Sequence, residues 1–457
     1  LSSPPGMGDE AVWATFYTGV SPARHGRFFG KQVWPGSYDL LRFKDSHLKH
    51  EPFWDVLSRA NKKVAILDVP KCPLSKGLNG IQLVDWMVHG AEHREVCSWP
   101  NGLASDVVKN FGEGPKCLCG YRVRSPSEIE NFLERVHTGI KRKTHLYVSL
   151  LQQNDWDLFL GVFKASHCVG HMWWHLWDSD HPYYREDLFR TWGNPIKDIY
   201  RALDASLGQI LEQAGHETVV LMFSDLGMGP NYTGNPLLPE ALKRFQGFSK
   251  NSGKAGLAWF RRAWKRLPAA VRTPLSSTLA PVNRRVANFE ESLSRFFVVP
   301  HNEISGAVRI NLKGREPNGC IQPGEEYESL CQTLSHELRQ MVCPETKRPL
   351  VRHVIRPREI DDGPYMENFP DLLVIWNRTQ PIDQAWSRNL GTIGGETFEY
   401  RPGNHVPDGI LFSSGPAISH GAAIEPVPLV DLPATITRLL GVPLPSCSGQ
   451  PIPELLR

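Results

Sequence analysis

Three histidines follow one another at intervals of four residues in the segment "SHCVGHMWWH". They are His167, His171 and His175, and they come shortly after the apolar run "WDLFLGVF". Residues four apart lie on the same face of a helix, so His167 and His171 can direct their ring nitrogens at one metal ion. His175 lies a further turn away, roughly 6 Å along the helix axis, and we expect it to pack or to touch substrate. A hydrogen-bonded surface pair would have the same spacing, but the pattern favours a metal site.

Three other residues of metal-binding or catalytic type stand beside apolar segments. Asp225 directly follows "ETVVLMFS", and His405 lies in the turn "RPGNHVPDG" before another apolar run. Either residue also suits an ordinary turn, where Asp is a common capping residue. Asp9 opens the segment "DEAVWATFYTG" and resembles the N-cap of a helix whose N-terminus can receive an anion. Spacing alone leaves the roles of these three residues open.

The elements that must position these residues alternate in type along the chain. Continuous apolar runs, which are typical of strands buried on both faces of a sheet, occur at 62–70, 156–163, 217–225, 370–377 and 408–415. Helical periodicity marks 126–152, 196–215, 325–342 and 429–441. The alternation predicts an α/β fold with a mostly parallel sheet. Ligands of such sheets bind beyond the carboxyl ends of the strands, which is where most of the candidate residues stand.

One segment departs from this alternation and is strongly basic. Between Lys243 and Arg272 the chain has nine Lys and Arg residues and no Asp or Glu. We expect an inserted helical cap at about 231–300 within a single domain that spans 1–457. Two functions suit a basic cap, a lid over an anionic substrate and a contact with an anionic membrane surface. A solvated helical insert is favoured over both, because charge runs are usually solvated faces.

The composition excludes several classes of protein. The chain has 457 residues, of which 41% are hydrophobic and 22% charged, as in an ordinary soluble globular protein. Its net charge of +3 is too small to indicate a nucleic-acid partner. No apolar run is long enough to span a bilayer. The nine cysteines are scattered, so we interpret them as mostly buried free thiols, which favours a cytoplasmic location. Nothing indicates the oligomeric state.

Four segments, taken in order, resemble the type I phosphodiesterase/nucleotide pyrophosphatase branch of the alkaline phosphatase superfamily. They are "WATFYTGVSPARHGRFFG", "FKASHCVGHMWWHLWD", "SDLGMGP" and "GNHVPDGILFSSGPAI". The resemblance covers nearly the whole chain, and it implies a three-layer α/β/α sandwich with a mostly parallel central sheet. It also implies hydrolysis of phosphate mono- or diesters, or of sulfate esters in some relatives. The family uses two metal ions, usually zinc, that flank a Thr or Ser nucleophile.

The resemblance implies that three histidines form one metal site. The first position of the family's "D-x-x-x-H" loop is His167 in this chain, and the last position is His171. His405 matches the family's final metal-binding histidine. Three neutral imidazoles with an open fourth position are a well-known zinc arrangement that generates hydroxide near neutral pH. The implied cofactor is therefore zinc or another divalent transition metal, with at least one ion bound.

The second metal site of the family is altered here. Asp225 keeps its place, but the adjacent histidine is replaced by Leu226, which cannot bind a metal. The family's first-strand aspartate would precede residue 1, since the chain opens with the loop-like "LSSPPGMGDE", and we expect a preceding segment. The nucleophile position falls on Asp9, and a shift in the alignment would leave Ser2 and Ser3 as more remote candidates.

Three interpretations follow from the resemblance. In the first, one ion on the three histidines serves a hydrolase in which Asp9 is general base, nucleophile or ligand. A carboxylate nucleophile would form an acyl phosphate that water then cleaves. In the second, Asp9, Asp225 and the preceding aspartate hold a second ion, of the magnesium or manganese type. In the third, the chain is catalytically silent and binds a metal and an anionic ligand.

The third interpretation is disfavoured, because His167 replaces one good ligand by another, which decay seldom does. We therefore expect a metal-dependent hydrolase of a small anionic phosphoric or sulfuric ester. Its specificity would lie in the cap and in the loops between Trp173 and Tyr184. We expect His25, in the segment "RHG", to hold the geometry of a helix-to-loop turn.

Overall fold

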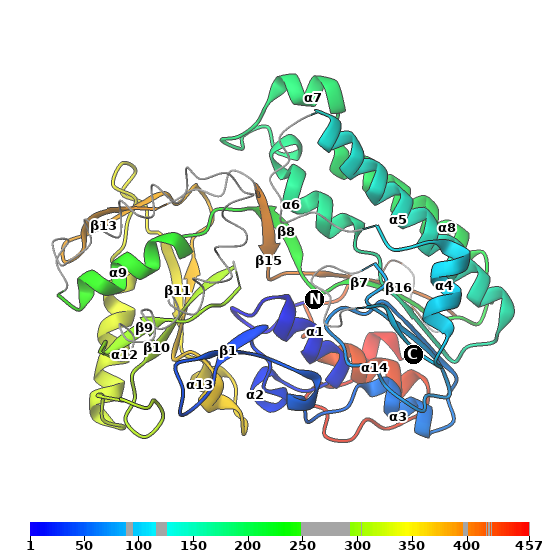
Figure 1. Ribbon diagram of the computed structural model, residues 1–457, viewed down its shortest axis with the longest axis horizontal. Coiled ribbons are helices and arrows are strands. Elements are labelled where there is room, and N and C mark those ends of the chain that lie inside the picture. Colours follow the sequence, from blue (N-terminus) through cyan, green and yellow to red (C-terminus); the bar gives the residue numbers. More distant parts are fainter. Residues whose placement is uncertain are drawn as a thin grey trace.

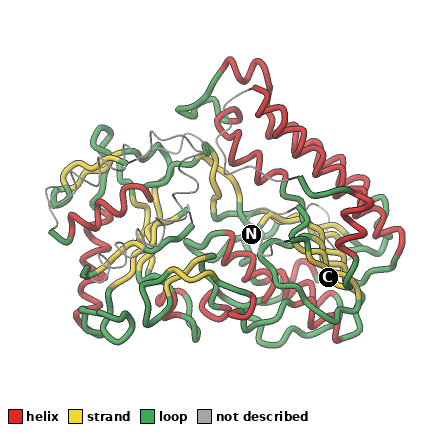
Figure 2. Tube along the Cα trace, viewed as in Figure 1, coloured by secondary structure: helices red, strands yellow, loops and turns green. Residues whose placement is uncertain are grey.

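The computed structural model describes the chain except for residues 88–94, 116–125, 248–292, 303, 396–400, 417, 419–420, 422 and 457. Its elements form two lobes that meet near the first residues of the chain (Figure 1). Figure 2 shows that the lobe at the right of the view has helices on both sides of its strands. The lobe at the left contains a separate sheet with its own helices.

The right-hand lobe is built on one four-stranded sheet and one pair of strands. The order in the sheet is β5 (Cys97–Trp99), β4 (Gly80–Val84), β3 (Val64–Leu67) and β6 (Leu158–Gly161). Strand β3 runs parallel to β4 and β6, whereas β5 is antiparallel to β4. The pair consists of the antiparallel strands β7 (Val220–Ser224) and β16 (Ile410–Ser414). The helices of the lobe are α1 (Asp9–Thr18), α2 (Pro22–His25), α3 (Phe53–Arg59), α4 (Leu103–Phe111), α5 (Pro126–Gln153), α6 (Ala165–Trp177), α7 (Glu186–Trp192), α8 (Pro195–Leu211) and α14 (Asp431–Leu439).

Alternating side chains of β3 place one helical layer on each face of this sheet. Ile66 packs in a core with Phe16 of α1 and Leu57 of α3. The next residue, Leu67, packs in another core with Leu146 of α5. Helices α1, α3 and α14 thus cover one face, and α5 and α8 lie on the other (Figure 1). The arrangement is the expected three-layer α/β/α sandwich.

The left-hand lobe contains a second, fully antiparallel sheet. Its order is β11 (Val351–Ile355), β12 (Leu372–Trp376), β10 (Ser305–Ile310) and β9 (Phe296–Val298). Helices α9 (Leu238–Phe245) and α12 (Glu325–Arg339) share an apolar core with it. The smaller elements of the molecule are the hairpins β1 (Lys31–Val33) with β2 (Leu40–Arg42) and β13 (Gln384–Ser387) with β14 (Gly391–Gly394), the short helix α13 (Pro357–Ile360), and the pair β8 (Gly227–Pro230) with β15 (Gly403–Val406).

All five apolar runs form strands and all four periodic segments form helices, so the α/β class is confirmed. The four-stranded sheet of the sandwich is mostly parallel, as expected, because β3 runs parallel to both of its neighbours. The other pairings among the described strands are antiparallel, which the apolar runs did not predict. Strand β12 shows the physical reason. Leu373 packs in the core shared with the right-hand lobe, whereas Leu372 and Val374 pack in the core of the left-hand lobe. An antiparallel strand buried on both faces has the same continuous apolar sequence as a parallel one.

Most of the expected basic cap, at 231–300, lies outside the described residues. Its described edges are the short helix η2 (Asn235–Leu237) with α9, and strand β9, which pairs with β10. These edges belong to the left-hand lobe. In the described part of the chain, no helix is both long and apolar enough to cross a membrane.

Candidate metal centre

Helix α6 carries two of the three histidines. It begins at Ala165, just beyond the carboxyl end of β6, with Lys164 as its N-cap. His167 lies in its first turn and is half-buried, and His171 follows one turn later with none of its surface exposed. The parallel pairing of β6 with β3 fixes this end of the helix at the edge of the sheet where strands of the sandwich end.

Strand β15 brings His405 to the same place from a distant part of the sequence. It pairs with β8, so that His405 stands opposite Met228, and both strands pack against α6. Two glycines permit this close approach. A Cβ atom on Gly403 would lie 1.9 Å from the Gly170 carbonyl oxygen, and a Cβ atom on Gly170 would lie 2.8 Å from Met228 Cε. The absence of both side chains therefore sets the distance between β15 and α6.

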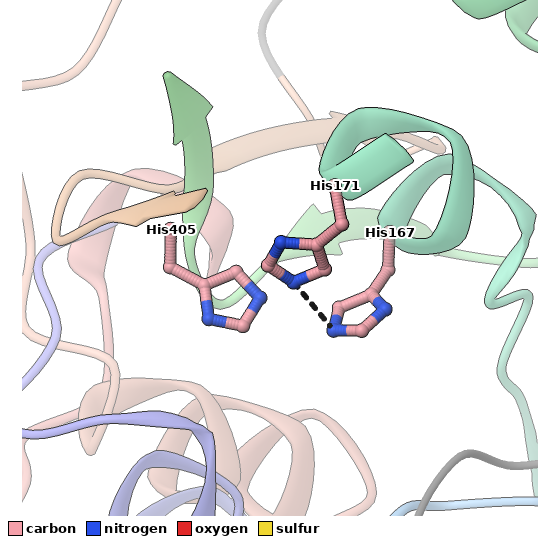
Figure 3. A group of neighbouring side chains, drawn as sticks. All are labelled: His167, His171 and His405. Carbon is pink, nitrogen blue, oxygen red and sulfur yellow. Dashed lines mark hydrogen bonds between the residues drawn. The ribbon is translucent and has the colours of Figure 1, made fainter. Parts of the chain in front are cut away.

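The three imidazole rings face one another across a small space (Figure 3). Each offers a ring nitrogen that lies within 4.8 Å of those of the other two. The Nε2 atoms of His167 and His171 are 3.2 Å apart. Zinc–nitrogen bonds of about 2.0–2.1 Å at a tetrahedral angle place two ligand nitrogens about 3.4 Å apart. The observed separation thus fits one ion between these rings. Among the described residues, this is the one cluster of three or more potential metal ligands.

The backbone orients His171 for such an ion. Its Nδ1 lies 2.8 Å from the Gly403 carbonyl oxygen, and it also lies 3.0 Å from Nε of Arg401, which donates a hydrogen bond to it. A proton on Nδ1, bonded to the Gly403 carbonyl oxygen, would leave the lone pair of Nε2 directed at the cluster, as second-shell partners of metal-binding histidines do. In this structure the guanidinium of Arg401 uses that lone pair, with Nη2 2.7 Å from Nε2. Arg401 therefore has to release His171 before a metal can bind.

Burial keeps all three imidazoles neutral. It lowers the pKa of His167 and of His171 well below the ordinary value of 6.5, and neighbouring positive charges add to the effect. Burial also lowers the pKa of His405 to about 4, although the negative charge of Asp9 opposes it. A neutral imidazole has its lone pair available, so the site needs to lose no proton before it binds a metal at neutral pH.

Asp9 and Asp225 lie outside the three-histidine cluster and have contrasting environments. Asp9 is the first residue of α1, and Gly8 rather than Asp9 is the N-cap. Burial alone would raise the pKa of Asp9, but the positive charge of Lys71, the interaction with His405 and the nearby Lys164 outweigh it and hold the pKa below 3.8. Asp9 is therefore ionised at neutral pH.

Burial raises the pKa of Asp225 to about 7, and the negative charge of Asp9 contributes to the shift. The Oδ2 atom of Asp225 is buried and has no hydrogen-bond partner in the structure. Beside it, Leu226 is buried in the apolar core and offers no ligand. The assignment of Asp225 as a metal ligand and of Asp9 as the catalytic residue thus stays a prediction.

Sequence reasoning missed two cations of this region, Lys164 and Arg401. Lys164 precedes the first histidine by three residues, and Arg401 precedes His405 by four. The sequence signal for them is a basic residue shortly before each segment of candidate metal ligands. Basic residues are too common in loops for this signal to be specific. Burial lowers the pKa of Lys164 to about 7, and the charge of Asp9 opposes that shift. Both cations place positive charge next to the site.

The remaining candidate residues, His175, His25 and Ser3, pack or form hydrogen bonds outside the cluster. His175 is not in the cluster, and its ring stacks on Trp173, as the expectation of packing requires. His25 lies 3.1 Å from the Thr15 hydroxyl through Nε2, and its Nδ1 accepts a hydrogen bond from the Arg27 backbone. It therefore holds the turn after α1, as expected. Ser3 donates a hydrogen bond to the carbonyl oxygen of Asp225.

Comparison with known proteins defines the family. The model of the type I phosphodiesterase/nucleotide pyrophosphatase family matches residues 11–332, which is more than half of the chain, so the chain belongs to this family of ester-bond hydrolases. The match includes the segments of Asp225 and of His167 and His171, whereas His405 lies beyond it. No protein among those with curated descriptions matches the chain.

Solved structures share the fold at low sequence identity. Murine ectonucleotide pyrophosphatase/phosphodiesterase 5 is 11% identical, with a TM-score of 0.50 over 97% of this chain and 86% of that chain. Phosphonoacetate hydrolase from Sinorhizobium meliloti 1021, solved in complexes with phosphonoformate and with phosphonoacetate, is 11% identical with a TM-score of 0.51 over 94% of this chain and 84% of that chain. The alkaline phosphatase-like fold is thus confirmed.

Proposed function

We propose that this protein hydrolyses small phosphoric esters, diesters or monoesters, with a divalent transition metal bound by His167, His171 and His405. The observation that carries the proposal is the 3.2 Å separation of the His167 and His171 Nε2 atoms, with the third ring beside them. Zinc is the first choice, because neutral imidazole nitrogens in this number are its usual catalytic ligands. A bound ion of this kind would polarise an ester oxygen and make bound water more acidic.

The residues of the chain suggest how an anionic ester is held. The three ligands carry no charge, so nothing in the ligand set offsets the charge of an ion. Arg401 already lies on the cluster, and a guanidinium is well suited to two oxygens of a phosphate group. We infer that Arg401 releases His171 when the ester binds and then holds the phosphate group of the substrate instead. The uncompensated charge of a bound ion and the nearby guanidinium would both favour a negatively charged substrate.

Asp9 is the proposed nucleophile. Its pKa is held below the ordinary value, so its carboxylate is ionised but too weakly basic for a good general base at neutral pH. A carboxylate oxygen would form a bond to phosphorus while the ester oxygen leaves and takes a proton from water. A second water would then cleave the acyl phosphate, which restores the carboxylate and releases the phosphate. Asp225, with a pKa of about 7, is suited to carry a proton in either step.

The test is turnover after controlled metal loading. The chelated protein would be reconstituted with zinc, manganese or magnesium and assayed with bis(4-nitrophenyl) phosphate, 4-nitrophenyl phosphate and 4-nitrophenyl sulfate. The proposal predicts metal-dependent release of nitrophenol from a phosphate ester, and loss of at least about a hundredfold in rate in Asp9→Asn. A His175→Ala variant serves as the control, because His175 lies outside the cluster.

The alternative is a catalytically silent relative that binds a metal and an anion. The replacement of the family's metal-binding histidine by the buried Leu226 favours it. It predicts that the protein retains a metal and binds inorganic phosphate without turning over any of the three esters. That outcome would contradict the hydrolase proposal while leaving the metal site intact.

A further inference from the structure

Strands β8 and β15 form a two-stranded ribbon that lies between the left-hand lobe and α6 (Figure 1). Among the described strands, they pair only with each other. A ribbon of two strands is marginally stable by itself, so its position depends on what it contacts. The ribbon packs against α6, where the close approach at Gly170 and Gly403 sets the distance. The left-hand lobe also contacts the ribbon, through Arg378.

Arg378 follows strand β12 and bridges the two strands of the ribbon. Its Nη1 atom donates a hydrogen bond to the carbonyl oxygen of His405, and its Nη2 atom donates one to the carbonyl oxygen of Pro230. In the register of the ribbon, Pro230 stands opposite Gly403, which precedes His405 by two residues. One planar guanidinium therefore ties β8 to the residue of β15 that carries the third imidazole.

The backbone from which the Arg378 side chain starts is itself held in place. The N–H group of the preceding residue, Asn377, donates a hydrogen bond to the carbonyl oxygen of Leu350 at 2.7 Å. The side-chain amide of Asn377 donates another, to the Pro349 carbonyl oxygen at 3.1 Å. Both acceptors lie just before β11, which is the neighbour of β12 in the same sheet. The hold on His405 thus extends into the sheet of the left-hand lobe.

The guanidinium of Arg378 is half-buried and lacks a counter-ion. No described carboxylate pairs with it, and its Nε atom is buried without a hydrogen-bond partner. Burial lowers the pKa of Arg378 to about 10, so the group is charged at neutral pH. Taking a charge out of water without an opposite charge is costly, and an apolar side chain of similar size often stabilises a fold as well. The cost is explained if the bond to His405 serves the site.

We propose that Arg378 is a positioning residue of the three-histidine site. By holding the His405 carbonyl oxygen, it keeps the third imidazole beside those of His167 and His171, whose ring centroids lie 5.0 Å and 4.7 Å away. A displacement of about 1 Å would take this ring out of reach of an ion, because zinc–nitrogen bonds are about 2.0–2.1 Å long. The inference rests on the metal site of the proposed function, but it concerns the position of a ligand and not turnover.

Two measurements on Arg378→Met test the proposal. Zinc affinity, measured by calorimetric titration of chelated protein, should fall by about tenfold or more, as changes in the outer shell commonly cause. In metal-free protein, the backbone amides of β15 should exchange hydrogen about fivefold faster or more. Arg244→Met is the matched control, because Arg244 also donates to two carbonyl oxygens, those of Leu390 and Thr392 in the β13–β14 hairpin. It should leave both quantities within about twofold of the wild type.

Zinc affinity in Arg378→Met that equals the wild-type value would overturn the proposal. Equal losses in Arg378→Met and Arg244→Met would overturn it too, because the effect would then be one of general stability. If Arg378→Met shows no thermal unfolding transition, Arg378→Lys decides. It keeps the charge without the fixed fork, so zinc affinity should fall by about threefold or more, and an unchanged affinity would contradict the bridge.

Metal uptake by the wild type separates this inference from the proposed function. Wild-type protein that takes up no zinc would contradict the metal site but not the hold on β15, which hydrogen exchange in metal-free protein reports alone. Faster exchange confined to β15 in Arg378→Met would then support the hold on His405, and unchanged exchange there would overturn it.

Discussion

At the scale of single residues, His167 stands where the resemblance to the family implies an aspartate, and this replacement most changes the chemistry that we propose. A carboxylate would have brought a negative charge to the ligand set, whereas an imidazole brings none. Burial has already removed the protons of all three rings at neutral pH. We therefore expect the site to bind a transition metal that prefers nitrogen ligands more tightly than magnesium, which prefers oxygen.

His167→Ala should weaken zinc binding by about a hundredfold or more, because two imidazoles remain where three bound the ion. His167→Asp, which restores the family's residue, should retain most of the affinity, since a carboxylate oxygen is also a zinc ligand. Isothermal titration of chelated protein measures both effects. His175→Ala is the matched control, and equal losses in His175→Ala and His167→Ala would place the ion elsewhere.

Asp225→Asn should stabilise the metal-free protein at alkaline pH. The pKa of Asp225 is about 7 when folded and about 3.8 when unfolded, so the folded protein holds an extra proton between these values. Its contribution to stability is therefore present at low pH and is lost as the pH rises through about 7. Thermal unfolding at pH 8.5 should show a higher Tm for the variant than for the wild type, with a much smaller difference at pH 5. A lower Tm at pH 8.5 would indicate an undetected partner for the carboxylate.

At the scale of elements, the sequence predicts the strands and helices but not how they meet. The apolar runs and the helical periodicity correctly locate β3, β12 and α5, because burial imposes both patterns. Pairing direction is not encoded in a strand that is buried on both faces, so the antiparallel sheet of β12 was not foreseen. The contact of β15 with α6 depends on Gly170 and Gly403, whose role is apparent only when the two elements are seen together.

Gly403→Ala should damage the metal site without touching a ligand. The new Cβ atom would lie 1.9 Å from the Gly170 carbonyl oxygen, so β15 must move away from α6 and carry His405 with it. Zinc affinity should fall by about tenfold or more, as outer-shell changes commonly cause. Gly208→Ala on α8 is the control, because its Cβ would meet no atom within 4 Å and alanine favours a helix. Equal affinities in the two variants would contradict the packing argument.

At the scale of the whole molecule, several histidines are buried without a proton. Burial lowers the pKa of His25 to about 3 and the pKa of His301 and of His405 to about 4. In the unfolded chain each would titrate near 6.5, so the unfolded state binds more protons as the pH falls below that value. The Tm of the metal-free protein should therefore drop between pH 6.5 and 4.5. The raised pKa of Asp225 has the opposite effect on the Tm as the pH falls, but it is one group, whereas several histidines lower the Tm. A Tm that stays constant over this range would show that these rings are solvated.

The cysteines bear on where the protein resides. Six of them are free thiols, as expected, but of these six only Cys72 and Cys331 are buried, whereas we expected most to be. The other four are Cys97, Cys320, Cys343 and Cys447. Cys168, between His167 and His171 on α6, is instead disulfide-bonded. The cytoplasmic location that the sequence favours stays a prediction.

The most direct test of the account is the stoichiometry of metal and turnover in one titration. Chelated wild-type protein would receive zinc in steps of a fraction of an equivalent, while bound metal and hydrolysis of bis(4-nitrophenyl) phosphate are followed together. Bound metal and hydrolysis should rise in parallel and saturate at about one equivalent, and both should be absent in the His167→Ala/His171→Ala double variant. Wild-type protein that takes up no zinc, or that binds one equivalent without any hydrolysis, would contradict this prediction.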